Sequence, residues 1–140
     1  MTDTNNASME LATIMSQPTG ALICTVPAKP GDTEAARIVF NALNNPTHKI
    51  KDYVNQQITV ANVLVEANEI LDEETGELEK APRCVLITPE GDSYMALSKG
   101  IFNSIKNAFI SYGPAPWNPA ITFTVKQRSV GRGTMLTLEA

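Results

Sequence analysis

The sequence has little of the material from which catalytic and metal sites are built. Its 140 residues include one histidine, His48, and two cysteines, Cys24 and Cys84. This is too little for a zinc site, which needs several His or Cys ligands, and it gives no Ser/His triad. Neither a GxGxxG nor a P-loop spacing is present. We therefore expect no enzyme activity, no catalytic residues, no bound metal, no cofactor and no small-molecule substrate.

Long hydrophobic runs are also missing. No apolar run approaches the roughly 20 residues that cross a bilayer, and the start MTDTNNASME lacks the basic and apolar regions of a signal peptide. Both cysteines stand in apolar, strand-like runs, which is typical of reduced buried thiols. We expect a cytoplasmic protein that does not bind membranes.

Charge is small in total but unevenly placed. The net charge is −4. Residues 66–79 hold seven acidic residues and no basic one, whereas residues 98–140 hold five basic residues and one acidic residue. Uneven charge of this kind bears on binding partners rather than on the fold.

The first 50 residues divide into a tail and a short α/β segment. Residues 1–19 are polar, with a weak apolar patch at Leu11, Ile14 and Met15, and we expect a flexible tail. Residues 21–27 are typical of a strand, and 33–44 of a helix capped by Asp32. We expect residues 20–47 to form an extension that packs on the main domain, residues 48–140.

The main domain alternates strands with one helix. Ser98 and Gly113 are good caps for a helix over 99–112, whose apolar stripe runs from Ile101 to Tyr112. Thr75-Gly76 indicates a hairpin tip. Strands are predicted over 58–71, 82–88, 93–97, 120–126 and 134–140. The order β-β-β-α-β-β is that of an OB-fold, although a small α+β sandwich could share it. We predict a mainly β protein, a five-stranded OB-fold barrel with an N-terminal α/β extension.

An OB barrel offers a surface for oligonucleotides or oligosaccharides. Single strands need cations for the phosphates and aromatic faces for the bases. Trp117 has a second interpretation as a cover for the end of the barrel, and Tyr94 as a half-buried strand residue. The candidate contacts are Tyr53, Tyr94, Trp117, Lys51, Lys99, Arg83 and, around the glycine turn of the last hairpin, Lys126, Arg128 and Arg132.

Several strings resemble a known family. They are KIKDYVNQQITVANVLVE, LDEETGE, PRCVLITPEGDSY, SKGIFNSI and GPAPWNPAITFTVKQ followed by GRGTMLTLE. They are similar to the small OB-fold single-stranded DNA-binding proteins of phages and conjugative plasmids of Gram-positive bacteria, over residues 48–139. The resemblance implies a protein that coats single-stranded DNA during replication or transfer, without base specificity and without catalysis. It places DNA contacts on Tyr94, Trp117, Lys126, Arg128 and Arg132.

A second function remains open on the same evidence. The chain would then be a protein-interaction or assembly module whose residues 1–19 dock on a neighbouring copy, and nucleic-acid binding would be incidental. Both hypotheses allow a homo-oligomer through residues 1–19, because cooperative coverage of a strand also needs contacts between neighbours.

Overall fold

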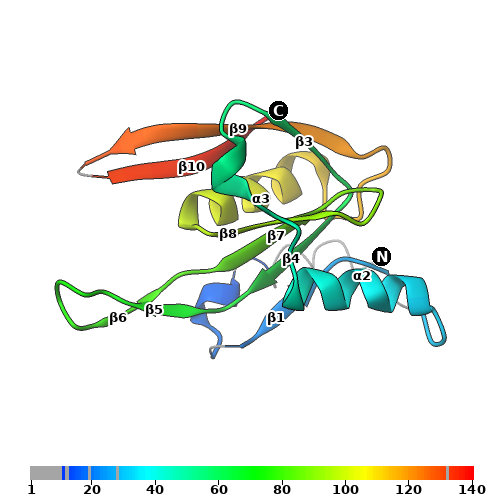
Figure 1. Ribbon diagram of the computed structural model, residues 1–140, viewed down its shortest axis with the longest axis horizontal. Coiled ribbons are helices and arrows are strands. Elements are labelled where there is room, and N and C mark those ends of the chain that lie inside the picture. Colours follow the sequence, from blue (N-terminus) through cyan, green and yellow to red (C-terminus); the bar gives the residue numbers. More distant parts are fainter. Residues whose placement is uncertain (1–10, 12, 19, 28, 132) are drawn as a thin grey trace.

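The computed structural model describes residues 11, 13–18, 20–27, 29–131 and 133–140. The protein is mainly β, as predicted, and its strands form two sheets and a separate hairpin (Figure 1). The larger sheet has the spatial order β1 (Leu22–Cys24), β4 (Asn62–Glu66), β7 (Arg83–Ile87), β8 (Ser93–Leu97) and β2 (His48–Lys49). The smaller sheet has the order β10 (Gly133–Glu139), β9 (Ile121–Val130) and β3 (Gln57–Val60). The hairpin pairs β5 (Glu69–Leu71) with β6 (Leu78–Lys80).

The long predicted strand over 58–71 is divided between the sheets. β3 belongs to the smaller sheet and β4 to the larger one, and Ala61 alone separates them. The Ala61 N–H donates to the Ile87 carbonyl at 2.9 Å, and its carbonyl accepts from the Trp117 N–H at 2.8 Å. Because both backbone groups of Ala61 are paired, the chain turns from one sheet into the other without leaving a buried polar group unsatisfied.

Helix α3 (Lys99–Tyr112) fills the space between the two sheets (Figure 1). Its N-cap is Ser98, as predicted, whose Oγ accepts from the Ile101 N–H at 3.1 Å. Ile101, Ile105 and Phe109 are buried in the main core. The predicted stripe is too long by one turn, because Tyr112 is 54% exposed.

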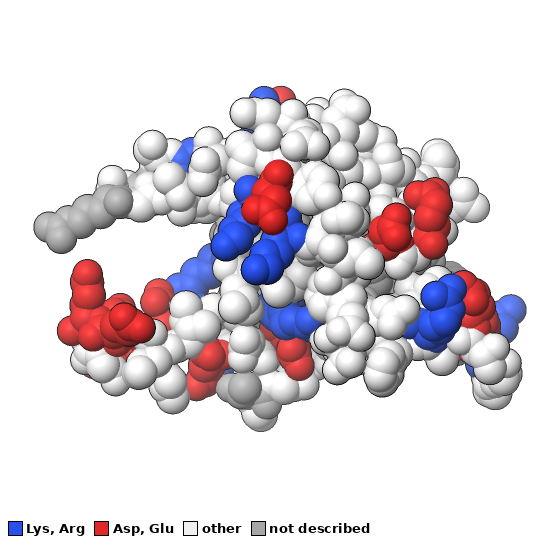
Figure 2. Space-filling model, viewed as in Figure 1, with Lys and Arg blue, Asp and Glu red and all other residues white. Residues whose placement is uncertain are grey.

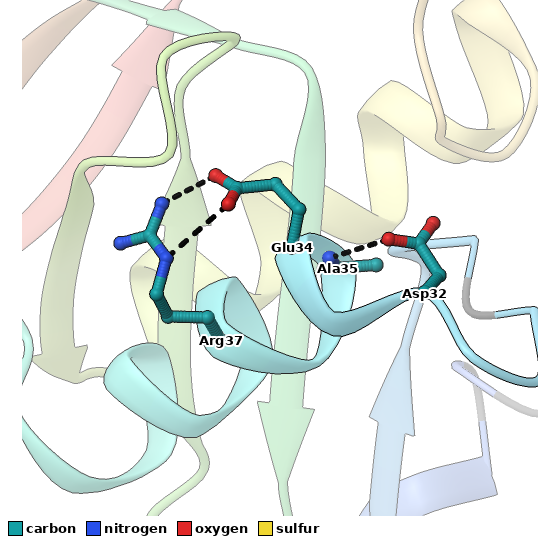
Figure 3. Close-up of polar contacts among 4 residues, drawn as sticks. All are labelled: Asp32, Glu34, Ala35 and Arg37. Atoms are coloured by element: carbon teal, nitrogen blue, oxygen red, sulfur yellow. Dashed lines mark hydrogen bonds and ion pairs between the residues drawn. The ribbon is translucent and has the colours of Figure 1, made fainter.

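Helix α2 (Thr33–Asn44) covers the opposite face of the larger sheet. The Asp32 carboxylate caps it by accepting from the Ala35 N–H at 3.0 Å, and Glu34 pairs with Arg37 on its outer side (Figure 3). A second small core joins Ala42 of α2 to Leu64, Val85 and Ile87. The central strands are therefore buried on both faces, which explains why their sequences are continuously apolar rather than alternating. Within the described ranges, no helix is long and apolar enough to cross a membrane.

Part of the expected tail lies in the main core. Leu11 is completely buried and Ile14 is 3% exposed, and both pack with the residues of the two sheets. These two residues contact their own chain, so they do not offer the free apolar patch that the assembly hypothesis requires. Residues 1–10 and the side chain of Met15 lie outside the described part of the chain.

The predicted closed barrel is not seen among the described strands. Closure needs pairing between β8 and β10, but β8 pairs with β7 and, in parallel, with the two-residue β2. The outer edge of β10 faces α3 instead, and the Leu138 N–H donates to Ser104 Oγ at 3.0 Å. β9 is longer than expected, since it continues to Val130, whereas β10 has the predicted seven residues, shifted by one position.

The contact between α3 and β10 leads to a prediction about stability. A Cβ on Gly100 would lie 2.0 Å from the Leu136 carbonyl oxygen and 2.4 Å from Met135 Cγ. In an exposed helix, Gly→Ala stabilises by up to about 1 kcal/mol. Here the added methyl group must push the strand away, so we expect Gly100→Ala to destabilise by about 1–3 kcal/mol in urea unfolding.

The matched control is Asn103→Ala, which changes an exposed position of the same helix. Its free energy of unfolding should stay within about 0.5 kcal/mol of the wild type. An unchanged or raised stability for Gly100→Ala would contradict the close packing described here.

Candidate nucleic-acid interface

A groove runs where β8 and β10 fail to pair. Its narrow part lies between the β8 residues Met95–Leu97, Leu136 of β10 and the lysines of the β2–η2 segment, where η2 is the 3₁₀ helix Ile50–Tyr53. Its wider part continues between two arms, the β5–β6 arm (69–80) and the β9–β10 arm (126–137), and reaches the start of α3. Lys51, Leu97 and Leu136 line both parts, so the groove is continuous.

The groove is basic, although the whole chain is acidic. Figure 2 shows Lys and Arg atoms around the hollow between the arms, and Asp and Glu atoms at the end of the lower arm. The wide part also receives the N-terminal end of α3, where the helix dipole is positive. The groove is lined by four lysines and one acidic residue, namely Lys49, Lys51, Lys80, Lys99 and Glu79.

Three aromatic rings form a cluster beside the narrow end of the groove. The His48 and Tyr94 rings are stacked with their centroids 4.4 Å apart, because the parallel pairing of β2 with β8 places these two residues in register. The Tyr53 ring meets both edge-on, and its hydroxyl is 2.8 Å from His48 Nδ1. All three side chains are half-buried. Lys49 lines both the groove and the hollow beside His48 and Tyr53, so the cluster adjoins the groove at this lysine. Asp52 also lines that hollow.

A comparison with family models decides which proteins this chain is related to. The model of the family described as phage single-stranded DNA-binding protein matches residues 22–139. The chain belongs to this family. No curated protein and no solved structure matches it. The match confirms the resemblance to phage proteins. It also covers more of the chain, because it includes β1 and α2 in addition to residues 48–139, on which the resemblance was based.

Four of the predicted contacts of this phage-type protein lie in the groove or in the aromatic cluster beside it. Tyr53 and Tyr94 belong to the aromatic cluster, and Lys51 and Lys99 line the groove. Lys99 is engaged, since its Nζ lies 3.1 Å from Glu79 Oε1. Burial raises the pKa of Tyr94, with smaller contributions from Tyr53, Asp92 and Glu90. A phenol is protonated at neutral pH in any case, and the raised pKa keeps the Tyr94 hydroxyl a hydrogen-bond donor further into the alkaline range.

The basic residues of the last hairpin are placed differently from the groove lysines. Side chains alternate along β9, and the buried Val125 and the groove-lining Gln127 share one face. Lys126 and Arg128 occupy the opposite face of β9, and they do not line the groove. Arg132, the third predicted cation of this hairpin, lies outside the described residues.

The prediction that Trp117 stacks on bases does not agree with its position. Its side chain is 6% exposed, and its ring packs against Phe109 and Phe123 with centroids 5.9 and 6.0 Å away. The indole N–H donates to the Gly113 carbonyl at 2.8 Å. With both its apolar surface and its donor in use, Trp117 serves as the cover of the core, which was the alternative interpretation.

Arg83 is also committed to a structural role. Its guanidinium donates to the carbonyls of Leu43 and Ala42 at 2.8 and 3.2 Å, and lies 3.9 Å from Glu66. These carbonyls belong to the last turn of α2, where a cation satisfies acceptors that have no partner in the helix. Arg83 therefore caps the C-terminal end of α2, in place of the predicted contact with DNA.

Sequence reasoning missed His48, Lys49, Lys80 and Gln127. His48 and Lys49 form a strand of only two residues, too short for any periodic signal. Lys80 directly follows a run of acidic residues, so the local sequence does not indicate a basic surface at this position. Among the described residues, no group of three His, Cys, Asp or Glu side chains is arranged to hold a metal ion. Burial raises the pKa of the Cys84 thiol, so this group is poorly nucleophilic.

The burial of Trp117 can be tested by fluorescence, because it is the only tryptophan of the chain. A side chain that is 6% exposed is shielded from ionic quenchers, so iodide should quench its emission weakly in the folded protein and strongly in urea. Saturation with oligo-dT should leave the iodide quenching constant almost unchanged. Strong quenching by iodide in the folded protein, relieved by DNA, would restore the stacking interpretation.

Proposed function

We propose that this protein coats single-stranded DNA without sequence preference during phage DNA replication, and that it acts by binding alone, without catalysis. The observation that carries the proposal is the continuous path from the Tyr53–His48–Tyr94 cluster along the lysines of the groove. Aromatic faces accept any base, and lysines accept any phosphate, so this combination suits a sequence-tolerant binder. The family of the chain supports the choice of single-stranded DNA as the ligand.

We interpret the fold as an OB barrel that is open at one seam. The bent β3–β4–β5 segment would be its first strand, β6–β7 its second, and β8, β9 and β10 the remaining three. In this interpretation, the first strand pairs with the second and fourth, and the second with the third. The fourth pairs with the fifth. Only the seam between the third and fifth strands is open, and the groove lies along it. DNA would thus bind where hydrogen bonding between β8 and β10 would have excluded it.

The salt dependence of binding tests the electrostatic part of this function. Each phosphate neutralised on a single strand contributes about −0.7 to the slope of log K against log salt. If all four groove lysines contact phosphates, the slope should be about −3, measured by anisotropy of labelled oligo-dT between about 50 and 200 mM salt. A matched duplex should bind more weakly, because paired bases cannot stack on the rings. An affinity that does not change with salt would contradict the proposal.

Substitutions in the groove test the two kinds of contact separately. Lys51→Gln should weaken binding and make the slope shallower by about 0.7, whereas Lys29→Gln, which removes an equal charge outside the groove, should change neither. Tyr94→Leu should cost about 1–3 kcal/mol of binding at every salt concentration, and Tyr112→Leu, at an exposed ring away from the cluster, should cost none. Circular dichroism melting curves confirm that each variant is folded. Equal effects in the paired variants would contradict this location of the site.

A further inference from the structure

Two of the four groove lysines form ion pairs with carboxylates of the protein itself. Lys99 Nζ lies 3.1 Å from Glu79 Oε1, and Lys80 Nζ lies 3.4 Å from Glu69 Oε1. Lys49 and Lys51 form no ion pair with any described residue. Both carboxylates belong to the β5–β6 arm, so this arm neutralises the lysines on its own side of the groove and leaves those on the β2–η2 side available.

Glu79 is the carboxylate that lies in the groove itself. It is the one acidic residue among those that line it, and it faces Lys99, the first residue of α3. An anion at that position gains from the cation and from the positive end of the helix dipole, which is also what a phosphate group would gain there. The acidic residues at the tip of the arm are different, because they do not line the groove. Asp72 Oδ1, for example, accepts from the Glu74 N–H of its own turn at 2.9 Å.

We propose that Glu79 takes the place of a DNA phosphate in the empty groove and is displaced from Lys99 when the strand binds. This inference rests on the function proposed above. Both partners of the pair are about half exposed, 56% for Lys99 and 52% for Glu79, so solvent weakens the pair, and a strand held at several other points of the groove can break it. The strand must break the Glu79–Lys99 pair before it gains the contact with Lys99, and the lost pair lowers the affinity of the complex.

The consequence is that the whole groove binds a long strand tightly, whereas the contact at Lys99 adds little to the affinity. A strand that covers the entire groove replaces Glu79 through its many other contacts. A short anion or a single nucleotide, which has only this contact to offer, does not. Glu79 therefore selects for long strands over short anions.

The test compares Glu79→Gln with the matched control Glu73→Gln, which removes an equal charge from the exposed arm tip. Glu79→Gln should bind oligo-dT about three- to fivefold more tightly than the wild type at low salt, and the gain should shrink as salt screens the charges. Glu73→Gln should bind as the wild type does. An unchanged or weakened affinity of Glu79→Gln, or an equal gain in Glu73→Gln, would overturn the inference.

A double-substitution cycle shows whether Glu79 acts through Lys99. In a Lys99→Gln background, the gain from Glu79→Gln should largely disappear, because there is no longer a cation to release. The same gain in both backgrounds would mean a general effect of charge and would overturn the proposed displacement. The same measurements distinguish a failure of this inference from a failure of the proposed function. If the wild type binds oligo-dT and Glu79→Gln does not differ from it, this inference fails and the function stands, whereas absence of binding by every variant would remove the function itself.

Discussion

The close approach of α3 to the edge of β10 is the constraint from which the groove and the aromatic cluster follow. Gly100 brings the helix backbone so near to Leu136 that no side chain fits between them, and Ser104 takes the hydrogen bond of the Leu138 N–H. A further strand cannot approach the part of the edge that the helix covers. Because β10 is held by the helix, β8 keeps an open edge, and the two-residue strand β2 pairs with part of it. The groove and the aromatic cluster both result from this arrangement.

The groove acquires its basic character from residues that are far apart in the sequence. Lys49 and Lys51 enter from the segment before the first long strand, Lys80 from the β5–β6 arm and Lys99 from the start of α3. The surface is therefore a property of the topology, since no stretch of the chain is strongly basic by itself. Such an arrangement lets an acidic protein present a local attraction for phosphates while its remaining surface repels other polyanions.

Local signals in the sequence were sufficient for the helices and the hairpin. Asp32, Ser98 and Gly76 mark caps and a turn through interactions within a few residues, and these survive in any fold. The positions that were predicted wrongly depend on distant partners. Trp117 is buried by Phe109 and Phe123, and Arg83 caps a helix about 40 residues earlier in the chain. A cation or an aromatic ring has the same appearance in the sequence whether it faces DNA or a neighbouring element. Tyr53 and Tyr94 were predicted separately and lie in one cluster, but their partner His48 was considered only for a zinc site or a Ser/His triad.

The stacked pair of His48 and Tyr94 has a thermodynamic consequence for the entry of a base. A lone aromatic side chain loses rotamer freedom when a base settles on it, and this entropy subtracts from the affinity. Here the two rings already hold each other 4.4 Å apart, and the backbone pairing of β2 with β8 fixes their relative position. If bases stack here, as in the function proposed above, an arriving base would extend a stack that exists before binding and would have little further ordering to impose. The backbone pairing of two short strands would then contribute to the affinity for a flexible ligand.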